Sequence, residues 1–159
     1  MEKLPFHETL IIIPTYNEID NIERMINTIF ELYPEVSLLI IEDGSPDGTA
    51  NVVKEYQKKF KNLFMIERTG KQGLATAYTT GFKWALDRNY NYVFEMDCDF
   101  SHDPKQVKDL LTEATQNELV IGSRYIDGIR IINWPFHRLL LSYLASIYTR
   151  FITNIPVHD

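Results

Sequence analysis

Two aspartates one residue apart, Asp97 and Asp99, directly follow residues 92–96, whose composition is typical of a buried, central β-strand. Alternate residues of an extended chain point to the same side, so both carboxylates can approach one point beyond the strand end. Two ionised carboxylates that lie so close repel each other unless a cation lies between them. Hard oxygen ligands suit Mg²⁺ or Mn²⁺, which stay partly hydrated and are completed by substrate phosphates. The spacing therefore predicts a site for a metal ion and a diphosphate at the mouth of a sheet.

The same segment also has a purely structural interpretation, a polar turn that begins the next helix. Asp103 followed by Pro104 is typical of an N-cap residue with proline at the first helical position. We assign Asp103 to this cap, and Asp97 and Asp99 to the metal. Cys98 is the only cysteine, so the chain cannot form an internal disulfide. Because no cluster of His and Cys accompanies it, we interpret Cys98 as a small buried side chain.

The composition of the 159-residue chain limits the class of protein. An apolar fraction of 45% and a charged fraction of 24% are typical of one globular domain that buries a core. A net charge of −6 argues against nucleic acid as a partner. The glycine patterns G-x-G-x-x-G and G-x-x-x-x-G-K-S/T are missing, which disfavours a dinucleotide-dependent oxidoreductase and a P-loop NTPase. No uninterrupted apolar run is long enough to cross a bilayer.

Runs of β-branched and apolar residues alternate along the chain with segments of helical periodicity. The apolar runs predict strands at residues 10–14, 36–41, 63–67, 92–96 and 119–123. Apolar residues three and four apart predict helices at 18–32, 52–60, 74–85 and 107–114, the first with Asn17 as its cap. This alternation is typical of an α/β fold with a mostly parallel central sheet and helices on both faces.

Polar side chains with unusual chemistry are predicted at the carboxyl ends of these strands, where open α/β sheets bind their ligands. Tyr16 and Glu18 follow the first predicted strand, and Asp43 follows the second. Lys71 follows the third strand, Asp97 and Asp99 follow the fourth, and Arg124 follows the fifth. Loops that cap helices also gather polar residues, and an exposed lysine in a helix-entry turn is an equal alternative for Lys71. The combination of acidic and basic groups favours a site for a nucleoside diphosphate and its metal.

Four ordered motifs resemble those of a known family. They are P-T-Y-N-E at 14–18, E-D-G-S-P-D-G-T at 42–49, D-C-D-F-S-H at 97–102 and I-G-S-R-Y at 121–125. The chain resembles the family-two glycosyltransferases, and within them the dolichyl-phosphate (polyprenyl-phosphate) mannosyltransferases. The resemblance covers nearly the whole chain and implies a Rossmann-like GT-A fold. Two positions depart from the family pattern, because Glu42 stands where an aspartate is common and Cys98 replaces a smaller residue.

The resemblance implies a role for residues of each motif. The base and ribose of the nucleotide would be contacted by Pro14, Tyr16 and Glu18, with Ile41 and Asp43 beside them. The sugar-nucleotide diphosphate would meet Asp97, Cys98 and Asp99, and Mg²⁺ or Mn²⁺ would be held by Asp99 with Asp97 and Ser101. The phosphate of the lipid acceptor would face Arg124 and Arg138. Catalysis would thus depend on Asp97, Asp99 and Arg124, and His102 would order the metal loop.

The activity implied by this resemblance is transfer of mannose from GDP-mannose to a polyprenyl phosphate of the dolichyl type, in one in-line displacement with inversion. With a second pKa of about 6, the acceptor phosphate is mostly dianionic near neutral pH and needs no strong general base. This agrees with the absence of an evident His–Asp base from the sequence. Alternatives are a UDP-glucose-dependent polyprenyl-phosphate glucosyltransferase, another family-two transferase, and a non-catalytic nucleotide-sugar-binding module.

Residues 126–159 differ in character from residues 1–125, which we expect to form the nucleotide-sugar-binding and catalytic core. Apolar residues repeat there at helical spacing, and the charges are Arg130, Arg138 and Arg150 against Asp127 alone. A basic amphipathic helix suits a membrane interface, although an apolar face packed on the domain would give the same pattern. Because of the resemblance, we expect residues 126–159 to belong to the same domain and to face the acceptor and the membrane. We also expect a cytoplasmic protein that is peripheral at the inner face of a membrane. Family members continue past the position of Asp159, so we expect a chain truncated at that end.

Overall fold

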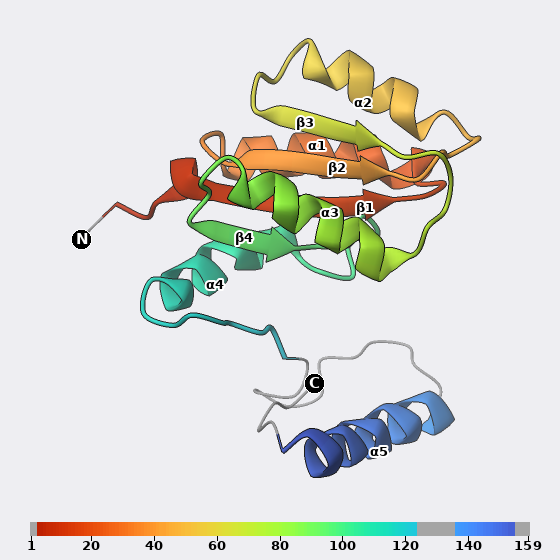
Figure 1. The fold of residues 1–159 in the computed structure, drawn as a ribbon, viewed down its shortest axis with the longest axis vertical. Coiled ribbons are helices and arrows are strands. Elements are labelled where there is room, and N and C mark those ends of the chain that lie inside the picture. Colours follow the sequence, from red (N-terminus) through yellow and green to blue (C-terminus); the bar gives the residue numbers. More distant parts are fainter. Residues whose placement is uncertain (1–2, 124–135, 155–159) are drawn as a thin grey trace. The chain divides into compact units, whose positions relative to one another are not determined.

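The computed structural model of the chain describes residues 3–123 and 136–154 (Figure 1). The chain divides into two compact units, residues 1–116 and residues 117–159. The boundary between them lies earlier than the one predicted after residue 125. That residues 126–159 belong to the same domain as the core stays a prediction.

The first unit is built on a four-stranded sheet whose strands are β1 (Thr9–Thr15), β2 (Ser37–Glu42), β3 (Leu63–Glu67) and β4 (Tyr92–Glu95). Their order is β3-β2-β1-β4, and every pairing is parallel. Parallel neighbours require crossover connections, and helices supply them here. The predicted α/β fold with a parallel sheet is confirmed.

Helices cover both faces of this sheet (Figure 1). On one face lie α1 (Ile19–Leu32), α2 (Thr49–Gln57) and α4 (Val107–Ala114), whose buried side chains join one core cluster. On the other face lies α3 (Leu74–Leu86), with Ala77 and Ala85 in a second cluster. Two short 3-10 helices complete the unit, η1 (Phe6–Glu8) and η2 (Pro104–Gln106).

The two core clusters explain the apolar runs of β1 and β2. In β1, Ile11 and Ile13 belong to the cluster beneath α1, whereas Leu10 and Ile12 belong to the cluster beneath α3. Successive strand residues point to opposite faces, so a strand covered on both sides is apolar at every position. Strand β2 follows the same alternation and is buried throughout.

Gly81 brings α3 close to β1. A Cβ atom added there would lie 2.7 Å from Cδ1 and 2.8 Å from Cγ2 of Ile12. These distances are shorter than a normal carbon–carbon contact, so a larger residue at this crossing would force the Ile12 side chain to shift.

Two sequence predictions about the sheet are wrong. Strand β4 lies at an edge of the described sheet and is half-buried to exposed, whereas we expected it to be central and buried. Residues 119–123 form no strand, and Leu119 and Ile121 are exposed. A strand needs a neighbour for its backbone N–H and C=O groups, and no described strand pairs with this segment.

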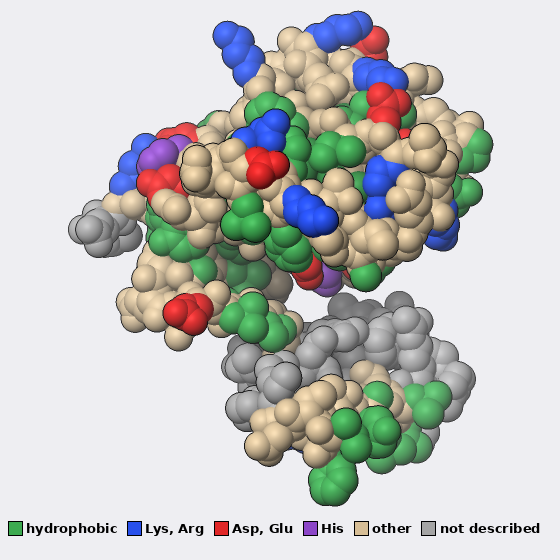
Figure 2. Space-filling model, viewed as in Figure 1, with side chains coloured by type: hydrophobic (Ala, Val, Ile, Leu, Met, Phe, Trp, Pro, Cys, Tyr) green, Lys and Arg blue, Asp and Glu red, His purple; other side chains and the backbone are tan. Residues whose placement is uncertain are grey.

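The second unit contains the predicted amphipathic helix as α5 (Phe136–Thr153). Apolar side chains of its described residues are exposed, as the green patches along it in Figure 2 show. They are Leu140, Leu141, Tyr143, Leu144, Ile147, Tyr148, Phe151 and Ile152. None of the helices in the described ranges is both long and apolar enough to span a bilayer. Asp127 and Arg130 lie outside the described residues.

Candidate active site

A cleft of about 230 Å³ lies where the strands of the first unit end. Its walls come from the segments after β1, β2, β3 and β4 and from the start of α3. The lining residues are Pro14, Thr15, Tyr16, Glu18, Asp43, Lys71, Gly73, Leu74, Ala77, Asp97, Cys98 and Asp99. Ligands of open α/β sheets bind at this edge, so the cleft is the candidate active site.

The parallel register brings these segments together. Pro14 pairs with Ile41 in β2, and Ile12 pairs with Glu95 in β4. The ladder continues past the strand ends, since the backbone N–H of Asp43 donates to the carbonyl of Thr15 (3.0 Å). Residues that follow different strands therefore reach one edge without a special loop conformation.

Asp97 and Asp99 both line the cleft because the chain keeps its alternation beyond β4. Met96 and Cys98 point the other way, into the core cluster beneath α1, and each is only 3% exposed. Burial raises the pKa of the Cys98 thiol to about 12, with further contributions from the charges of Glu18, Asp99 and Asp97. Cys98 is therefore a buried thiol, and the carboxylates on either side of it are the polar groups that reach the cleft.

The carboxylate of Asp99 is held in its ionised form by its own turn. Hydrogen bonds from the side chain and the backbone N–H of Ser101 hold the pKa of Asp99 below its ordinary value. The backbone bond, to Oδ1, is 2.9 Å long. Phe100 between them has a left-handed backbone, with φ of 62°. The carboxylate is thus charged and fixed in orientation before any ligand binds.

Asp97 has a different set of neighbours. The hydroxyl of Tyr78 lies 3.5 Å from its Oδ1, and Nε2 of His102 lies 4.0 Å from its Oδ2. The backbone N–H of Asp97 donates to Nδ1 of His102 (3.2 Å), which fixes the imidazole against the turn. Burial and the charge of Asp97 raise the pKa of Glu95. Negative charge is therefore concentrated where β4 ends.

The donor set fits a divalent cation that shares its shell with a phosphate. Within the described residues, neither Asp97 nor Asp99 forms an ion pair with a lysine or arginine. Nor do three or more His, Cys, Asp or Glu side chains of that part come close enough to hold a metal on their own. Mg²⁺ and similar ions use one or two carboxylates and take their other ligands from water and substrate phosphates. Asp97 and Asp99 would hold such an ion.

Asp43 forms a buried ion pair with Arg68. The guanidinium donates from Nε to Oδ1 (2.6 Å) and from Nη2 to Oδ2 (2.7 Å), and both side chains are less than 10% exposed. The N–H of Gln72 also donates to Oδ2 of Asp43 (3.3 Å). Asp43 thus anchors the segment that carries Lys71, in addition to lining the cleft. Its predicted contact with the nucleotide stays a prediction.

Arg68 was missed by the sequence reasoning. Glu42 of β2 pairs with Glu67 of β3, so the next residues of the two strands, Asp43 and Arg68, lie side by side. The signal that could have identified Arg68 is a basic residue directly after one strand and an acidic residue directly after its neighbour. Using it requires the register between β2 and β3.

Lys71 and Tyr16 meet at the cleft. The Nζ atom of Lys71 lies 4.7 Å from the centre of the Tyr16 ring, within the range of a cation–π contact. Both residues line the cleft. A basic group is therefore present beside the acidic residues, as the sequence predicted.

The start of α1 is capped from the loop that follows β2. The N–H of Ile19 donates to Oδ2 of Asp47 (3.0 Å), and the N–H of Glu18 donates to Oγ1 of Thr49 (3.0 Å). Asn17 was predicted to be this cap, but it adopts a left-handed backbone with φ of 60°, and no side-chain cap bond is formed at the residue preceding α1. The groups that Asn17 would have satisfied are taken by the other loop.

Two predicted site residues, Ile41 and Ser101, are not among the residues that line the cleft. Ile41 is fully buried in the cluster beneath α3. Arg124 and the side chain of Arg138 lie outside the described residues. Asp103 caps η2 as predicted, since its Oδ1 accepts from the N–H of Lys105.

Thr15 is a further cleft residue that the sequence did not single out. Its hydroxyl is buried and has no hydrogen-bond partner among the described residues.

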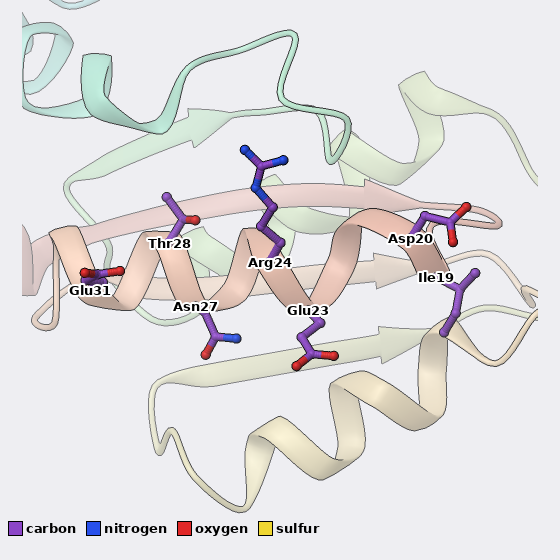
Figure 3. A pocket seen from close by; sticks show the side chains of 7 residues that line it. All are labelled: Ile19, Asp20, Glu23, Arg24, Asn27, Thr28 and Glu31. Atoms are coloured by element: carbon purple, nitrogen blue, oxygen red, sulfur yellow. The ribbon is translucent and has the colours of Figure 1, made fainter.

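A second hollow, of about 410 Å³, runs along the outer surface of α1 (Figure 3). The seven side chains that line it all belong to that one helix. It is an open surface formed by a single helix, so we do not assign the reaction to it.

Residues 10–159 match the model of the family described as glycosyl transferase family 2. The chain belongs to this family. A likeness to TarS from S. aureus (residues 1–349) agrees with the GT-A fold, with a TM-score of 0.57 and 21% identity over 80% of this chain and 38% of that one. The predicted GT-A type of α/β fold is thus confirmed.

Two curated relatives within glycosyl transferase family 2 have names that state an activity. Polyprenol monophosphomannose synthase of Mycolicibacterium smegmatis is 41% identical, over 98% of this chain and 59% of that protein. Undecaprenyl-phosphate mannosyltransferase of Micrococcus luteus is 38% identical, over 94% of this chain and 62% of that protein. The chain therefore spans about three fifths of the length of these relatives.

Proposed function

We propose that this chain carries the donor-binding and catalytic part of an inverting mannosyltransferase that uses GDP-mannose and a polyprenyl phosphate. The observation that carries the proposal is that Asp97 and Asp99 line the same cleft as Tyr16 and Glu18. Neither carboxylate is neutralised by a lysine or arginine of the described residues. The names of the relatives, both acting on a polyprenyl-type phosphate, support the acceptor class.

In this proposal the nucleotide lies along the segment after β1, with its base and ribose near Pro14, Tyr16 and Glu18. Its diphosphate extends toward Asp97 and Asp99, which hold Mg²⁺ or Mn²⁺ with help from Ser101. When bound, such an ion neutralises charge on the departing diphosphate and orients it. Ser101 acts through Asp99, since its hydrogen bonds orient that carboxylate and lower its pKa.

The acceptor phosphate is the nucleophile. It is mostly dianionic near neutral pH, with a second pKa of about 6, so no side chain has to remove a proton. Arg124 and Arg138 would hold it in line with the anomeric carbon, a positioning role. His102 would order the turn and not act as a base, because its Nδ1 already accepts from the N–H of Asp97.

The exposed apolar side chains of α5 support attachment to a membrane surface, where a polyprenyl phosphate would be found. Phe151 is 84% exposed, and Tyr148 and Leu141 are about two-thirds exposed, at 66% and 65%. A helix whose apolar residues lie open to solvent is typical of one that binds at a lipid interface. We propose that the protein is peripheral at the inner, cytoplasmic face of a membrane.

The decisive experiment replaces Asp99 with alanine and measures GDP binding by calorimetry, with and without Mn²⁺. The expected result is metal-dependent binding of GDP, but not UDP, by the wild-type chain, and loss of the metal dependence in Asp99→Ala. The matched control is Asp87→Ala, which removes an exposed aspartate at the end of α3. Normal metal-dependent binding by Asp99→Ala would contradict the assignment, and preference for UDP would contradict the donor.

Transfer itself is tested with radiolabelled GDP-mannose and a polyprenyl phosphate in detergent or vesicles. Labelled lipid product formed by the wild type and not by Asp99→Ala is the expected result. Nucleotide binding without any product would instead identify a non-catalytic binding module.

A further inference from the structure

Phe100 has an unfavourable backbone conformation directly beside the carboxylates of the cleft. Its φ is 62°, and the other described non-glycine residues with positive φ are Asn17, Asn89 and Asn154. Asparagine tolerates this left-handed region, whereas a bulky aromatic residue adopts it only when surrounding contacts hold it there. A contact must therefore stabilise Phe100.

Arg24 of α1 supplies this contact. Its guanidinium carbon lies 4.3 Å from the centre of the Phe100 ring, a cation–π geometry. Figure 3 shows Arg24 extending toward the segment that follows β4, whereas Glu23 and Asn27 point toward the opposite side of the helix. The Phe100 ring also packs against the core cluster beneath α1. The aromatic ring is thus held by the core and by an exposed arginine from another element.

The conformation of Phe100 determines where the metal-site groups point. Its neighbour Ser101 donates its N–H to Asp99, and the next residue, His102, accepts from the N–H of Asp97. Both bonds close the turn that begins at Asp97. If Phe100 left its left-handed conformation, Ser101 and Asp99 would no longer face each other as they do.

We infer that Arg24 is a positioning residue, which clamps Phe100 and thereby holds the turn of residues 97–102 ready for metal and diphosphate. This inference rests on the proposed function for the metal, but the clamp itself is a property of the metal-free chain. Arg24 contacts neither the cleft nor the reacting groups in the described structure. Its effect would therefore be transmitted through Phe100.

The first measurement is hydrogen–deuterium exchange of the peptide covering residues 97–103 in the metal-free, full-length chain. Loss of an exposed cation–π contact corresponds to roughly a two- to fivefold change in an equilibrium. Arg24→Ala should therefore speed exchange in this peptide by that factor, and Arg24→Lys should restore part of the protection. Arg88→Ala is the matched control. The guanidinium carbon of Arg88 lies 4.0 Å from the ring centre of Trp84 in α3, and neither residue lines the cleft.

The second measurement is Mn²⁺ affinity in the presence of GDP. Arg24→Ala should weaken it roughly two- to fivefold, with Arg88→Ala equal to wild type. In a Phe100→Gly background, where the backbone needs no clamp, Arg24→Ala should change neither measurement. Since Arg24 is exposed, circular dichroism should show an unchanged fold.

The outcomes separate the two proposals. Unchanged exchange at residues 97–103 in Arg24→Ala overturns the clamp, whatever the metal does. Faster exchange with unchanged Mn²⁺ affinity overturns the positioning role. Absence of Mn²⁺ and GDP binding from the wild type overturns the proposed function and leaves the exchange result to decide the clamp.

Discussion

Replacing Arg68 with methionine should destabilise the chain far more than removal of any surface charge. The substitution removes both charged hydrogen bonds to Asp43, of 2.6 and 2.7 Å, and leaves that carboxylate with the 3.3 Å bond from Gln72. The Asp43 side chain is 8% exposed, so its carboxylate would be left largely desolvated without the guanidinium. Breaking a buried pair from one side costs about 3–5 kcal/mol, because the remaining charge is desolvated and unpaired.

The natural comparison is the ion pair between Lys54 and Glu67. It is nearly as short, at 2.8 Å, but its side chains are 48% and 49% exposed. Exposed pairs of this kind contribute about 0–1 kcal/mol. Urea denaturation followed by circular dichroism should therefore give a much larger loss of unfolding free energy for Arg68→Met than for Lys54→Met.

A double variant tests whether the cost is electrostatic. Replacing a buried pair with apolar residues on both sides is often nearly neutral, so Arg68→Met combined with Asp43→Leu should recover most of the stability lost in Arg68→Met. If the single variant costs no more than Lys54→Met, the ion pair does not stabilise the fold as argued. If the double variant is as unstable as the single one, packing and not charge explains the loss.

Two further predictions concern the core. Gly81→Ala should lower the free energy of unfolding by up to about 2 kcal/mol, since overpacking against the buried Ile12 costs about 1–3 kcal/mol and alanine returns about 1 in helix propensity. Thr79→Ala on the exposed side of α3 is the control, and a gain of about 1 kcal/mol in Gly81→Ala, as helix propensity alone would give, would refute the close approach. Cys98, with burial raising its pKa from 9.0 to about 12, should react with a thiol reagent at pH 8 about a thousandfold more slowly in the folded chain than in urea. The folded thiol keeps its proton to higher pH, so its rate of reaction with the reagent should rise as the pH approaches 12. Equal reaction rates for the folded and the unfolded chain would refute the burial of Cys98.

The elements of the first unit could be predicted because the information is local. Strands β1 and β2 are covered on both faces, so their inner positions, 10–14 and 38–41, are all apolar. Helix α1 shows its buried face as apolar residues three and four apart. Strand order is not local. The apolar content of residues 92–96 does not reveal whether one neighbour or two will pair with them, and the structure places β4 at the edge of the described sheet.

The residues of the candidate site likewise include some that local sequence predicts and others that depend on strand pairing. Asp97 and Asp99 could be predicted because they lie two residues apart directly after a strand, and the structure places them in the cleft although Cys98 and Asp99 belong to a turn. The pair of Asp43 and Arg68 could not, since it joins residues after two strands and depends on their register. Ile41 was misplaced because α3 still covers the end of β2, where it buries Ile41, while Asp43 has passed beyond the helix into the cleft.

The motif after β2 has a structural role that its polar composition conceals. The carboxylate of Glu42 is buried and accepts from the N–H groups of Gly44 and Ser45, at 2.9 and 2.7 Å. The long side chain of Glu42 thus turns back and closes its own loop. The side chain is directed into this loop and is not among the residues that line the cleft.

The same loop then holds the start of α1. Hydroxyl oxygens of Ser45 and Thr49 and a carboxylate oxygen of Asp47 accept from three consecutive N–H groups, those of residues 17–19. The motif after β1 and the motif after β2 are therefore bound to each other before either meets a ligand. A substitution at Asp47 or Thr49 acts first on the position of Tyr16 and Glu18, so a loss of nucleotide affinity in such a variant does not identify a ligand contact. The side chains of Ser45, Asp47 and Thr49 are already occupied in holding the two loops together, so Tyr16 and Glu18, which line the cleft, are better reporters of a direct ligand contact.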